Sequence, residues 1–274
     1  MAISMSDLKK VRATEPPRIL IYGDPGIGKT SLAASFPSPV FIQVEDGTPS
    51  DLELNSFGKI QDFESVMQAL SALYAEDHDF KTVVIDSISE MESLVFSETC
   101  QRGDEKGNKK NNIEDYGYGK GYIYAQRVWR EFLSGVNALR NDRGMSVVLI
   151  AHATVDRFDD PETVSYNRYE IDLHAKSVGA IERDMDAILL VKRAITVKSD
   201  DVGFNKSRAV AEGGSNIFIY TEGRAAFEAK NRYGMPPKIK FDKGAGFNSI
   251  APYLPGIEKP SQEKAPANSK KEAA

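Results

Sequence analysis

Apolar and polar positions follow two patterns along the first half of the chain. Short unbroken apolar runs, rich in Val and Ile, predict β-strands at residues 18–22, 40–44, 82–86 and 146–151. Unbroken runs of this kind are typical of parallel strands that are covered on both faces. Between these strands lie segments in which apolar residues recur at helical spacing.

The helical segments are residues 29–36, 62–75, 89–101 and 121–140. The longest of them places its apolar side chains on one face: Val128, Trp129, Phe132, Leu133, Val136 and Leu139. Strands that alternate with helices predict an α/β fold, in which helices flank a mostly parallel sheet. Residues 102–112 are charged, glycine-rich and without periodicity, which predicts a mobile surface loop.

The second half of the chain has a different pattern. Residues 152–184 are polar and weakly patterned, which predicts a long loop with a short helix. The turn-separated apolar runs that follow predict a β-rich, antiparallel C-terminal part, with strands at residues 187–192, 195–198, 209–211, 217–220 and 225–230. We expect residues 1–15 to be a lead-in, residues 16–253 one core domain, and residues 254–274 a disordered tail.

Composition narrows the functions that such a fold could serve. The chain has 274 residues, of which 41% are hydrophobic, so it can bury a sizeable core. Its formal net charge of −5 excludes a basic coat for nucleic acid, so contact with nucleic acid needs a local patch. The single cysteine, Cys100, excludes an internal disulfide. Because no apolar run reaches membrane-spanning length and no signal-peptide core is present, we expect a cytoplasmic protein without a membrane partner.

The strongest chemical signal is the stretch Gly-Asp-Pro-Gly-Ile-Gly-Lys-Thr at residues 23–30. It matches G-x-x-x-x-G-K-[ST], the phosphate-binding loop of nucleoside triphosphatases, and it lies between a predicted strand and a predicted helix. Backbone N–H groups at a helix start meet phosphate charge, and glycines let the backbone approach. A chance glycine-rich turn is the alternative. The residues expected to bind ATP are Gly23, Asp24, Pro25, Gly26, Ile27, Gly28, Lys29, Thr30 and Ser31.

Acidic residues at two strand ends could supply the metal-binding and water-activating groups of an ATP site. Asp86 ends one predicted strand, where it could hold Mg²⁺ opposite the Thr30 hydroxyl, although capping of the next helix is the alternative. Glu45 follows another strand, where a carboxylate could orient and deprotonate the attacking water. The adjacent Asp46 competes for that role, and a solvated acid is the further alternative. ATP and Mg²⁺ are therefore the expected ligands.

Three basic residues complete the candidate catalytic set. His152 follows the strand at residues 146–151 and could hydrogen-bond the γ-phosphate or its water, with a structural histidine as the alternative. Lys230 and Arg232 are two residues apart, so an extended backbone would point both to the same side. Such a pair suits a cationic clamp on phosphate charge that develops during reaction, whereas an ordinary basic strand end is the alternative.

The phosphate loop, the strand ends at Glu45, Asp86 and His152, and the later Lys-Asn-Arg stretch together resemble the RecA/DnaB class of ATPases. The resemblance covers about residues 15–240 and implies a RecA-like core. It implies that Glu45 is the catalytic glutamate and that His152 senses the γ-phosphate. It also implies that the Lys-x-Arg pair reaches the ATP of a neighbouring subunit, in a head-to-tail ring or filament.

More closely, the chain resembles small phage-encoded ATP-binding proteins of the RecA-like recombinase group, through residues 116–121 and 169–176. That resemblance implies DNA-stimulated ATP hydrolysis, single-stranded DNA binding, and annealing or recombination inside a bacterial host. It also implies a phage single-strand binding protein as a further partner. Loops after the third and fourth strands would contact DNA through phosphate-neutralising cations and base-stacking tyrosines, which here are Lys109, Lys110, Arg157, Tyr166, Arg168, Tyr169 and Lys176.

Two other functions stay open from the sequence. A helicase-like or packaging-like motor would use the same ATP site, and a nucleotide-switched loader or regulator would use it with little turnover. The ATPase rate with and without single-stranded DNA separates the loader or regulator from the recombination protein and the motor.

Overall fold

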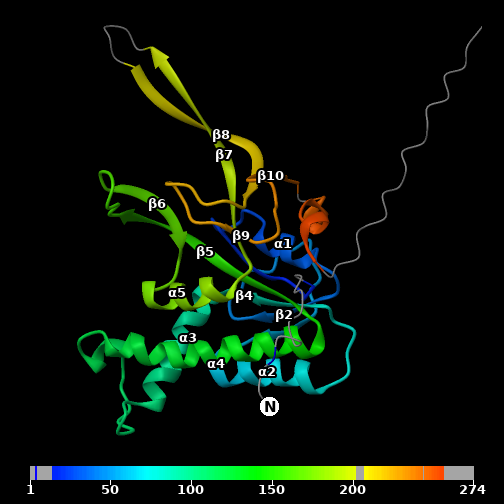
Figure 1. Cartoon of the computed structure of the whole chain (residues 1–274), viewed down its shortest axis with the longest axis vertical. Helices are drawn as coiled ribbons and strands as arrows, with labels where there is room; N and C mark the ends of the chain where they lie inside the picture. Colours follow the sequence, from blue (N-terminus) through cyan, green and yellow to red (C-terminus); the bar gives the residue numbers. More distant parts are fainter. Residues whose placement is uncertain (1–3, 5–13, 202–206, 243, 256–274) are drawn as a thin grey trace, which may run out of the picture.

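The computed structural model describes residues 4, 14–201, 207–242 and 244–255 (Figure 1). In this part of the chain one sheet has the strand order β10-β8-β7-β1-β5-β4-β2-β3, with β6 beside β5 and β9 beside β7. The strands are β1 (Arg18–Gly23), β2 (Pro39–Gln43), β3 (Ser56–Lys59), β4 (Thr82–Asp86), β5 (Ser146–Phe158), β6 (Tyr166–Ile171), β7 (Ala187–Asp201), β8 (Ser207–Tyr220), β9 (Lys230–Asn231) and β10 (Lys238–Phe241). The helices are α1 (Lys29–Ala34), α2 (Phe63–Ala75), α3 (Ile88–Arg102), α4 (Lys120–Arg143) and α5 (Ala175–Asp184), with 3-10 turns η2 (Ile113–Tyr116), η3 (Gly246–Ser249) and η4 (Ala251–Tyr253).

Strand direction divides the sheet into two parts. The part from β7 through β1, β5, β4 and β2 to β3 is parallel. The remaining strands, β6, β8, β9 and β10, pair antiparallel with their neighbours. The predicted α/β fold, with a mostly parallel sheet and an antiparallel C-terminal part, is therefore confirmed. Figure 1 shows β7 and β8 extending together beyond the rest of the sheet.

Side chains of the central strand β1 alternate between two packed layers. Leu20 and Tyr22 face the layer that holds α2 to α5, whereas Ile19 and Ile21 face α1 and residues 244–254. All four are fully buried, as expected for a parallel strand covered on both faces. The apolar faces of the helices on both sides therefore pack against one shared sheet.

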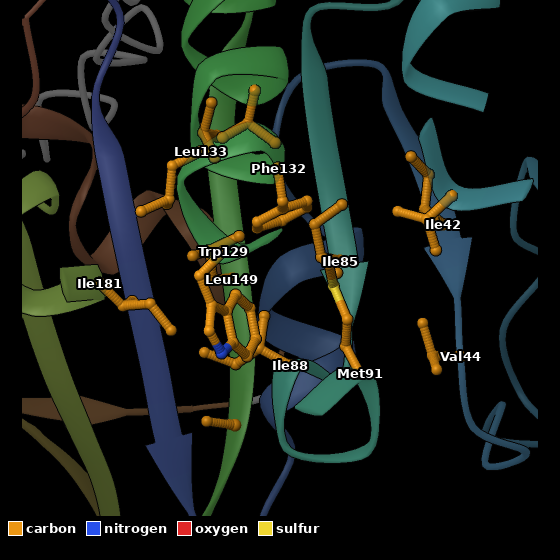
Figure 2. Packing of buried hydrophobic residues seen from close by; sticks show 14 of the residues in the cluster. Ile42, Val44, Ile85, Ile88, Met91, Trp129, Phe132, Leu133, Leu149 and Ile181 are labelled. Carbon is orange, nitrogen blue, oxygen red and sulfur yellow. The ribbon is translucent and has the colours of Figure 1, made fainter. Parts of the chain in front are cut away.

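The layer that holds α2 to α5 is built around α4. Figure 2 shows Trp129 and Phe132 of α4 lying against Ile85 of β4 and Leu149 of β5. The indole Nε1 of Trp129 donates a hydrogen bond to the Ser177 hydroxyl at 3.0 Å, which gives the buried N–H its partner and fixes α5 against α4. This contact positions the segment that follows β6.

The sequence-based prediction for residues 152–184 was only partly right. The short helix is present as α5, but the predicted loop contains the outer half of β5 and all of β6. β5 is buried up to Ala151 and becomes half-buried or exposed beyond it, because its outer half pairs with β6 alone. A strand in this setting has no continuous apolar run, so its periodicity does not reveal it.

The antiparallel part also differs in detail from the prediction. The strands expected at 187–192 and 195–198 are one continuous strand, β7, and those at 209–211 and 217–220 are both within β8. Only Lys230–Asn231 remains of the strand expected at 225–230, and neither β3 nor β10 was predicted. The boundaries at residues 15 and 254 stay a prediction, and most of the lead-in and tail (residues 1–3, 5–13 and 256–274) lies outside the described residues. None of the helices in the described part is both long and apolar enough to cross a membrane.

Gly121 at the start of α4 offers a test of this packing. A Cβ there would overlap the carbonyl oxygen of Ile113, whereas a Cβ at Gly179 in α5 meets nothing within 4 Å. We expect Gly121→Ala to lower the free energy of unfolding by about 1–3 kcal/mol through overpacking. Gly179→Ala should raise it by up to about 1 kcal/mol, since alanine has the better helix propensity. Thermal or denaturant unfolding measures both, and an unchanged Gly121→Ala protein would contradict the packing of η2 on α4.

Candidate functional site

Three strand ends and the middle of a fourth strand meet at one edge of the parallel sheet. β1, β5, β4 and β2 are adjacent in that order, so the carboxyl ends of β1, β4 and β2 lie beside the point where β5 leaves the main sheet. In the register, Gly23 pairs with His152, and Gln43 pairs with Asp86. A cavity of about 390 Å³ opens at this edge and is lined by residues at or next to these positions, including Lys29, Thr30, Glu45, Asp86 and His152.

The phosphate loop itself depends on its glycines. Gly26 and Gly28 have positive φ angles of 70° and 109°, which residues with a Cβ adopt at a cost. A Cβ on Gly23 would overlap the carbonyl oxygen of Val191 in the neighbouring strand β7. The cavity is lined by Pro25, Gly26, Gly28, Lys29, Thr30 and Ser31, whereas Gly23, Asp24 and Ile27 hold the loop from outside it.

Lys29 is the buried cation of the loop. Its ammonium donates to the carbonyl oxygens of Gly23 at 2.8 Å and Asp24 at 3.1 Å. Burial lowers the pKa of Lys29, and the charges of Asp86, Glu45 and Asp24 oppose that effect. The hydrogen bonds to loop carbonyls hold the positive charge at the mouth of the loop, where phosphate oxygens could replace the carbonyls.

Thr30 and Asp86 form the pair expected of a divalent-cation site. The Thr30 hydroxyl donates to Asp86 Oδ2 at 2.9 Å, and the other oxygen, Oδ1, is buried and has no hydrogen-bond partner among the described residues. Burial raises the pKa of Asp86 to about 6; the Thr30 hydrogen bond lowers it, and the Glu45 charge adds to the rise. Buried oxygen ligands that lack partners are what Mg²⁺ prefers, so these residues fit the ion.

Glu45 is held in place by two hydrogen bonds on one oxygen. Ser87 Oγ lies 3.0 Å and His152 Nε2 lies 2.9 Å from Glu45 Oε2. Burial would raise the pKa of Glu45. The hydrogen bond and charge of His152, the hydrogen bond of Ser87 and the charge of Lys29 together outweigh burial, so the pKa of Glu45 is held below its usual value. The same hydrogen bond raises the pKa of His152, against the opposing effect of burial. Glu45 is thus an ionised carboxylate beside the phosphate loop.

The adjacent acid Asp46 has a different environment. Its side chain is 81% exposed and its carboxylate pairs with Lys59, although Asp46 also borders the cavity. Of the two neighbouring acids, only Glu45 is hydrogen-bonded to His152 and Ser87. The geometry therefore favours Glu45 over Asp46 as the group that meets a water molecule.

Sequence reasoning missed two serines at this site. Ser87 binds Glu45, and the Ser89 hydroxyl accepts the backbone N–H of His152 at 2.9 Å. The only signal for Ser87 was its place before a helix, where it also accepts the Glu90 N–H as an N-cap. The carbonyl oxygen of His152 accepts the Asp172 N–H at 3.0 Å, which links the cavity to the end of β6.

The candidate DNA-contacting residues after α3 lie on an exposed turn. Lys109 donates to Gln101, and Lys110 lies 3.7 Å from Asp104. Asp104 also accepts hydrogen bonds from the Asn108 backbone and side chain, so the predicted surface loop has its own internal contacts. Lys109 is therefore exposed, whereas Lys110 is half-buried, with its ammonium near Asp104 and 5.8 Å from the centre of the Tyr116 ring.

The candidates after β5 fall into two groups. Arg157 is 73% exposed with Asp159 as its ion-pair partner, and Lys176 is exposed with its ammonium near the Gly119 carbonyl at 3.5 Å. Arg168 is the opposite case, since Glu170 and Glu228 both bind it and its side chain is 18% exposed. The further candidates Tyr166 and Tyr169 are half-buried; Tyr166 donates to Asp160, and the Lys192 ammonium lies 3.8 Å above the ring of Tyr169.

The second candidate DNA segment contacts the start of α4. Besides the Lys176–Gly119 contact, Gln126 of α4 donates to the Lys176 carbonyl at 3.1 Å. Tyr118, which the sequence analysis did not single out, lies next to this contact with a fully exposed side chain and a positive φ of 49°. The β5–β6 hairpin, α5 and the start of α4 project on the same side of the molecule, on the left in Figure 1.

Lys230 and Arg232 lie at the other edge of the sheet. Asn231 pairs with Ala187 at the start of β7, so both cations are remote from the phosphate loop of their own chain. Lys230 donates to the Glu182 carbonyl at 2.7 Å, and Arg232 forms an ion pair with Asp186 at 3.1 Å. The two side chains have separate partners within the chain, and the Arg232 side chain is 53% exposed.

Comparison with known proteins gives one family match. A family model described as an AAA domain matches residues 15–233. Among solved structures, one entitled "Crystal structure of the RadB recombinase" is similar at 13% sequence identity, over 89% of this chain and 93% of that chain, with a TM-score of 0.47. A likeness of that degree carries no argument about function. A comparison with curated proteins found no match.

Proposed function

This chain belongs to the AAA domain family, and on that premise we propose that it hydrolyses ATP and binds single-stranded DNA in a phage-type recombination reaction, in the cytoplasm of a bacterial host. One observation carries the ATPase part of the proposal. Lys29, Thr30, Glu45, Asp86 and His152 come from four adjacent parallel strands and the segments that follow them, and they line a single cavity. Phosphate binding, metal binding and water activation each have a suitable group there.

In this proposal the phosphate loop binds the β- and γ-phosphates of ATP. Lys29 exchanges its hydrogen bonds to the Gly23 and Asp24 carbonyls for phosphate oxygens. Glu45, ionised and fixed by His152 and Ser87, accepts a proton from the water that attacks the γ-phosphate. His152 keeps the carboxylate aligned, and its own buried Nδ1 has no hydrogen-bond partner within the described residues.

Thr30 and Asp86 would hold Mg²⁺ at this site. When bound, the ion neutralises charge on the phosphate oxygens. The backbone of Asp86 also contacts the strand end that carries Glu45. The Asp86 carbonyl oxygen accepts the backbone N–H groups of Val44 and Glu45, which fixes the proposed metal-binding strand end beside the proposed catalytic one.

The first functional prediction concerns turnover. Glu45→Gln keeps the shape of the side chain and removes the base, so we expect normal ATP binding and hydrolysis at least roughly 100-fold slower, the lower end for a general base. Steady-state ATPase rates, measured with and without single-stranded DNA, and titration calorimetry of ATP test this. Asp46→Asn is the matched control, since Asp46 is exposed and pairs with Lys59. Slow ATP hydrolysis by Asp46→Asn, together with normal hydrolysis by Glu45→Gln, would show that Asp46 and not Glu45 is the base.

Single-stranded DNA is proposed to bind along the candidate segments after α3 and β5. Arg157, Lys109 and Lys176 are exposed cations on these segments, and the exposed Tyr118 supplies a stacking surface next to the Lys176–Gly119 contact. Cations that track a backbone, together with aromatic rings that stack on bases, are typical of sequence-independent strand binding. The His152–Asp172 hydrogen bond joins the same hairpin to the ATP cavity, which supports DNA stimulation of the ATPase.

Removal of exposed charge should weaken DNA binding in a salt-dependent way. We expect a variant with alanine at positions 109, 157 and 176 to bind oligo(dT) less tightly. The slope of log affinity against log salt should become shallower by about 2, since each lost phosphate contact removes about 0.7. Fluorescence anisotropy over a salt series measures both. Lys81→Ala is the control, because Lys81 is exposed at the amino end of β4, on the opposite edge of the sheet. An unchanged slope in the triple variant would place the DNA elsewhere.

A head-to-tail oligomer is the third part of the proposal. Lys230 and Arg232 lie away from the phosphate loop of their own chain, so they could reach only the γ-phosphate of a neighbour. A cation supplied by a neighbouring subunit stabilises the charge that grows during phosphate transfer. The exposed half of the Arg232 side chain supports this role, whereas its ion pair with Asp186 would have to open.

Mixing two inactive variants tests completion of the site between subunits. Arg232→Ala should bind ATP and hydrolyse it slowly, as should Glu45→Gln. Their mixture should regain activity, because some interfaces then pair an intact Glu45 with an intact Arg232. A variant that carries both changes, mixed with Glu45→Gln, has no intact Glu45 and should regain nothing. Absence of recovery in the first mixture, with subunit exchange demonstrated, would make Arg232 a structural partner of Asp186.

A further inference from the structure

A second cavity, of about 660 Å³, lies apart from the ATP site. Its walls come from β6, α5, the start of β7 and residues 223–230. None of its lining residues belongs to the cavity at the phosphate loop. Its volume is within the range of about 300–1,000 Å³ that is typical of small-molecule sites.

Residues that line this cavity differ in exposure. Arg183 and Arg224 are exposed at the rim, and neither guanidinium has an ion-pair partner among the described residues. Lys230 is half-buried and donates to the Glu182 carbonyl. The apolar surface is deepest, because Ile188 and Phe227 are buried. The rim therefore attracts an anion while the interior suits a planar apolar group.

Two carboxyl groups face each other inside the cavity. Glu182 and Glu228 both line the cavity, and a hydrogen bond joins their side chains. Burial, then this hydrogen bond and the Glu228 charge, raise the pKa of Glu182 to about 8. Arg168 binds Glu228 at 2.8 Å, and the Tyr22 hydroxyl, one residue before the phosphate loop, donates to the Glu228 carbonyl at 2.5 Å. The contacts with Arg168 and Tyr22 hold Glu228 in place, so the pair offers hydrogen-bond acceptor oxygens at a fixed position.

Charge and shape together restrict the ligand. A simple cation would be repelled by the arginine and lysine side chains, and a simple anion would meet the acid pair. A nucleotide satisfies both parts, because its phosphate is anionic and its base is a planar group with N–H donors. We propose that this cavity binds one nucleotide, with the phosphate toward Arg183 and Arg224 and the base against Glu182 and Glu228.

Carboxyl oxygens accept hydrogen bonds, so the base should present adjacent donors. Guanine offers two parallel N–H groups and thymine offers one, so a guanine nucleotide is the expected ligand. The nucleotide could be free in solution or one unit of a DNA strand. The proposal goes beyond the ATPase and does not depend on it.

Binding of dGMP and dTMP to the full-length Lys29→Ala protein tests the site. This variant lacks the cation of the phosphate loop, and a monophosphate lacks the β- and γ-phosphates that the loop would bind. Titration calorimetry or ligand-observed NMR should show dGMP bound at least about tenfold more tightly than dTMP, as for a bidentate base contact. Failure of dGMP to bind at millimolar concentration would overturn the proposal, and would leave the ATPase assignment untouched.

Two further changes locate the site, and each has a matched control. Arg183→Glu should weaken both nucleotides about tenfold or more, as for loss of a charge-assisted hydrogen bond; Arg130→Glu, on the exposed face of α4, should change neither. Glu182→Gln should reduce the preference for dGMP to less than about threefold, and the exposed neighbour Glu222→Gln should preserve it. Unchanged affinities in both site variants, with intact thermal unfolding, would overturn the proposal.

Competition then identifies the source of the nucleotide. Displacement of bound dGMP by an oligo(dT) strand with one central dG, and not by oligo(dT) alone, supports a unit of a DNA strand. Retention of dGMP in the presence of both strands supports a free nucleotide.

Discussion

Adjacency of four parallel strands is the constraint on which the rest of the structure depends. Because β1, β5, β4 and β2 run in the same direction and lie side by side, the carboxyl ends of β1, β4 and β2 and the middle of β5 bring Lys29, Glu45, Asp86 and His152 to one edge. The close approach of Gly23 to Val191 in β7 fixes the start of the phosphate loop at the same height. Burial of both faces of β1 makes this arrangement rigid, so the polar groups at its end have little freedom.

Burial at this edge also sets the protonation of the site. The hydrogen bond between Glu45 and His152 lowers the pKa of Glu45 and raises that of His152, so the carboxylate form of Glu45 is favoured beside the phosphate loop. Asp86 is affected in the opposite direction, because burial and the Glu45 charge raise its pKa to about 6. Two carboxylates on adjacent strands therefore have different environments, which suits one to water and the other to a divalent cation.

The strand that carries His152 connects this chemistry to the outer part of the molecule. β5 is one continuous strand whose inner half belongs to the main sheet and whose outer half pairs with β6. His152 stands at the boundary, with its N–H on Ser89, its side chain on Glu45 and its carbonyl on Asp172. A displacement of Glu45 would thus be passed through His152 to the hairpin. The second cavity is also linked to the loop, through the hydrogen bond of Tyr22 to Glu228.

Local sequence determined the phosphate loop, the four inner strands, the helices and the strand-end positions of Glu45 and Asp86, whereas β5 continues past His152 to Phe158. Each of these depends on nearest neighbours in the chain, on an apolar run or on glycine spacing, which a sequence displays directly. Tertiary structure alone decided the rest. β3, β6 and β10 have weak periodicity and exist because a partner strand completes their hydrogen bonds. The choice of Glu45 over Asp46 rests on His152 and Ser87, and the Glu182–Glu228 pair joins α5 to a distant loop. Contacts between residues so far apart in the chain leave no local pattern, because they follow from how the strands are ordered in the sheet.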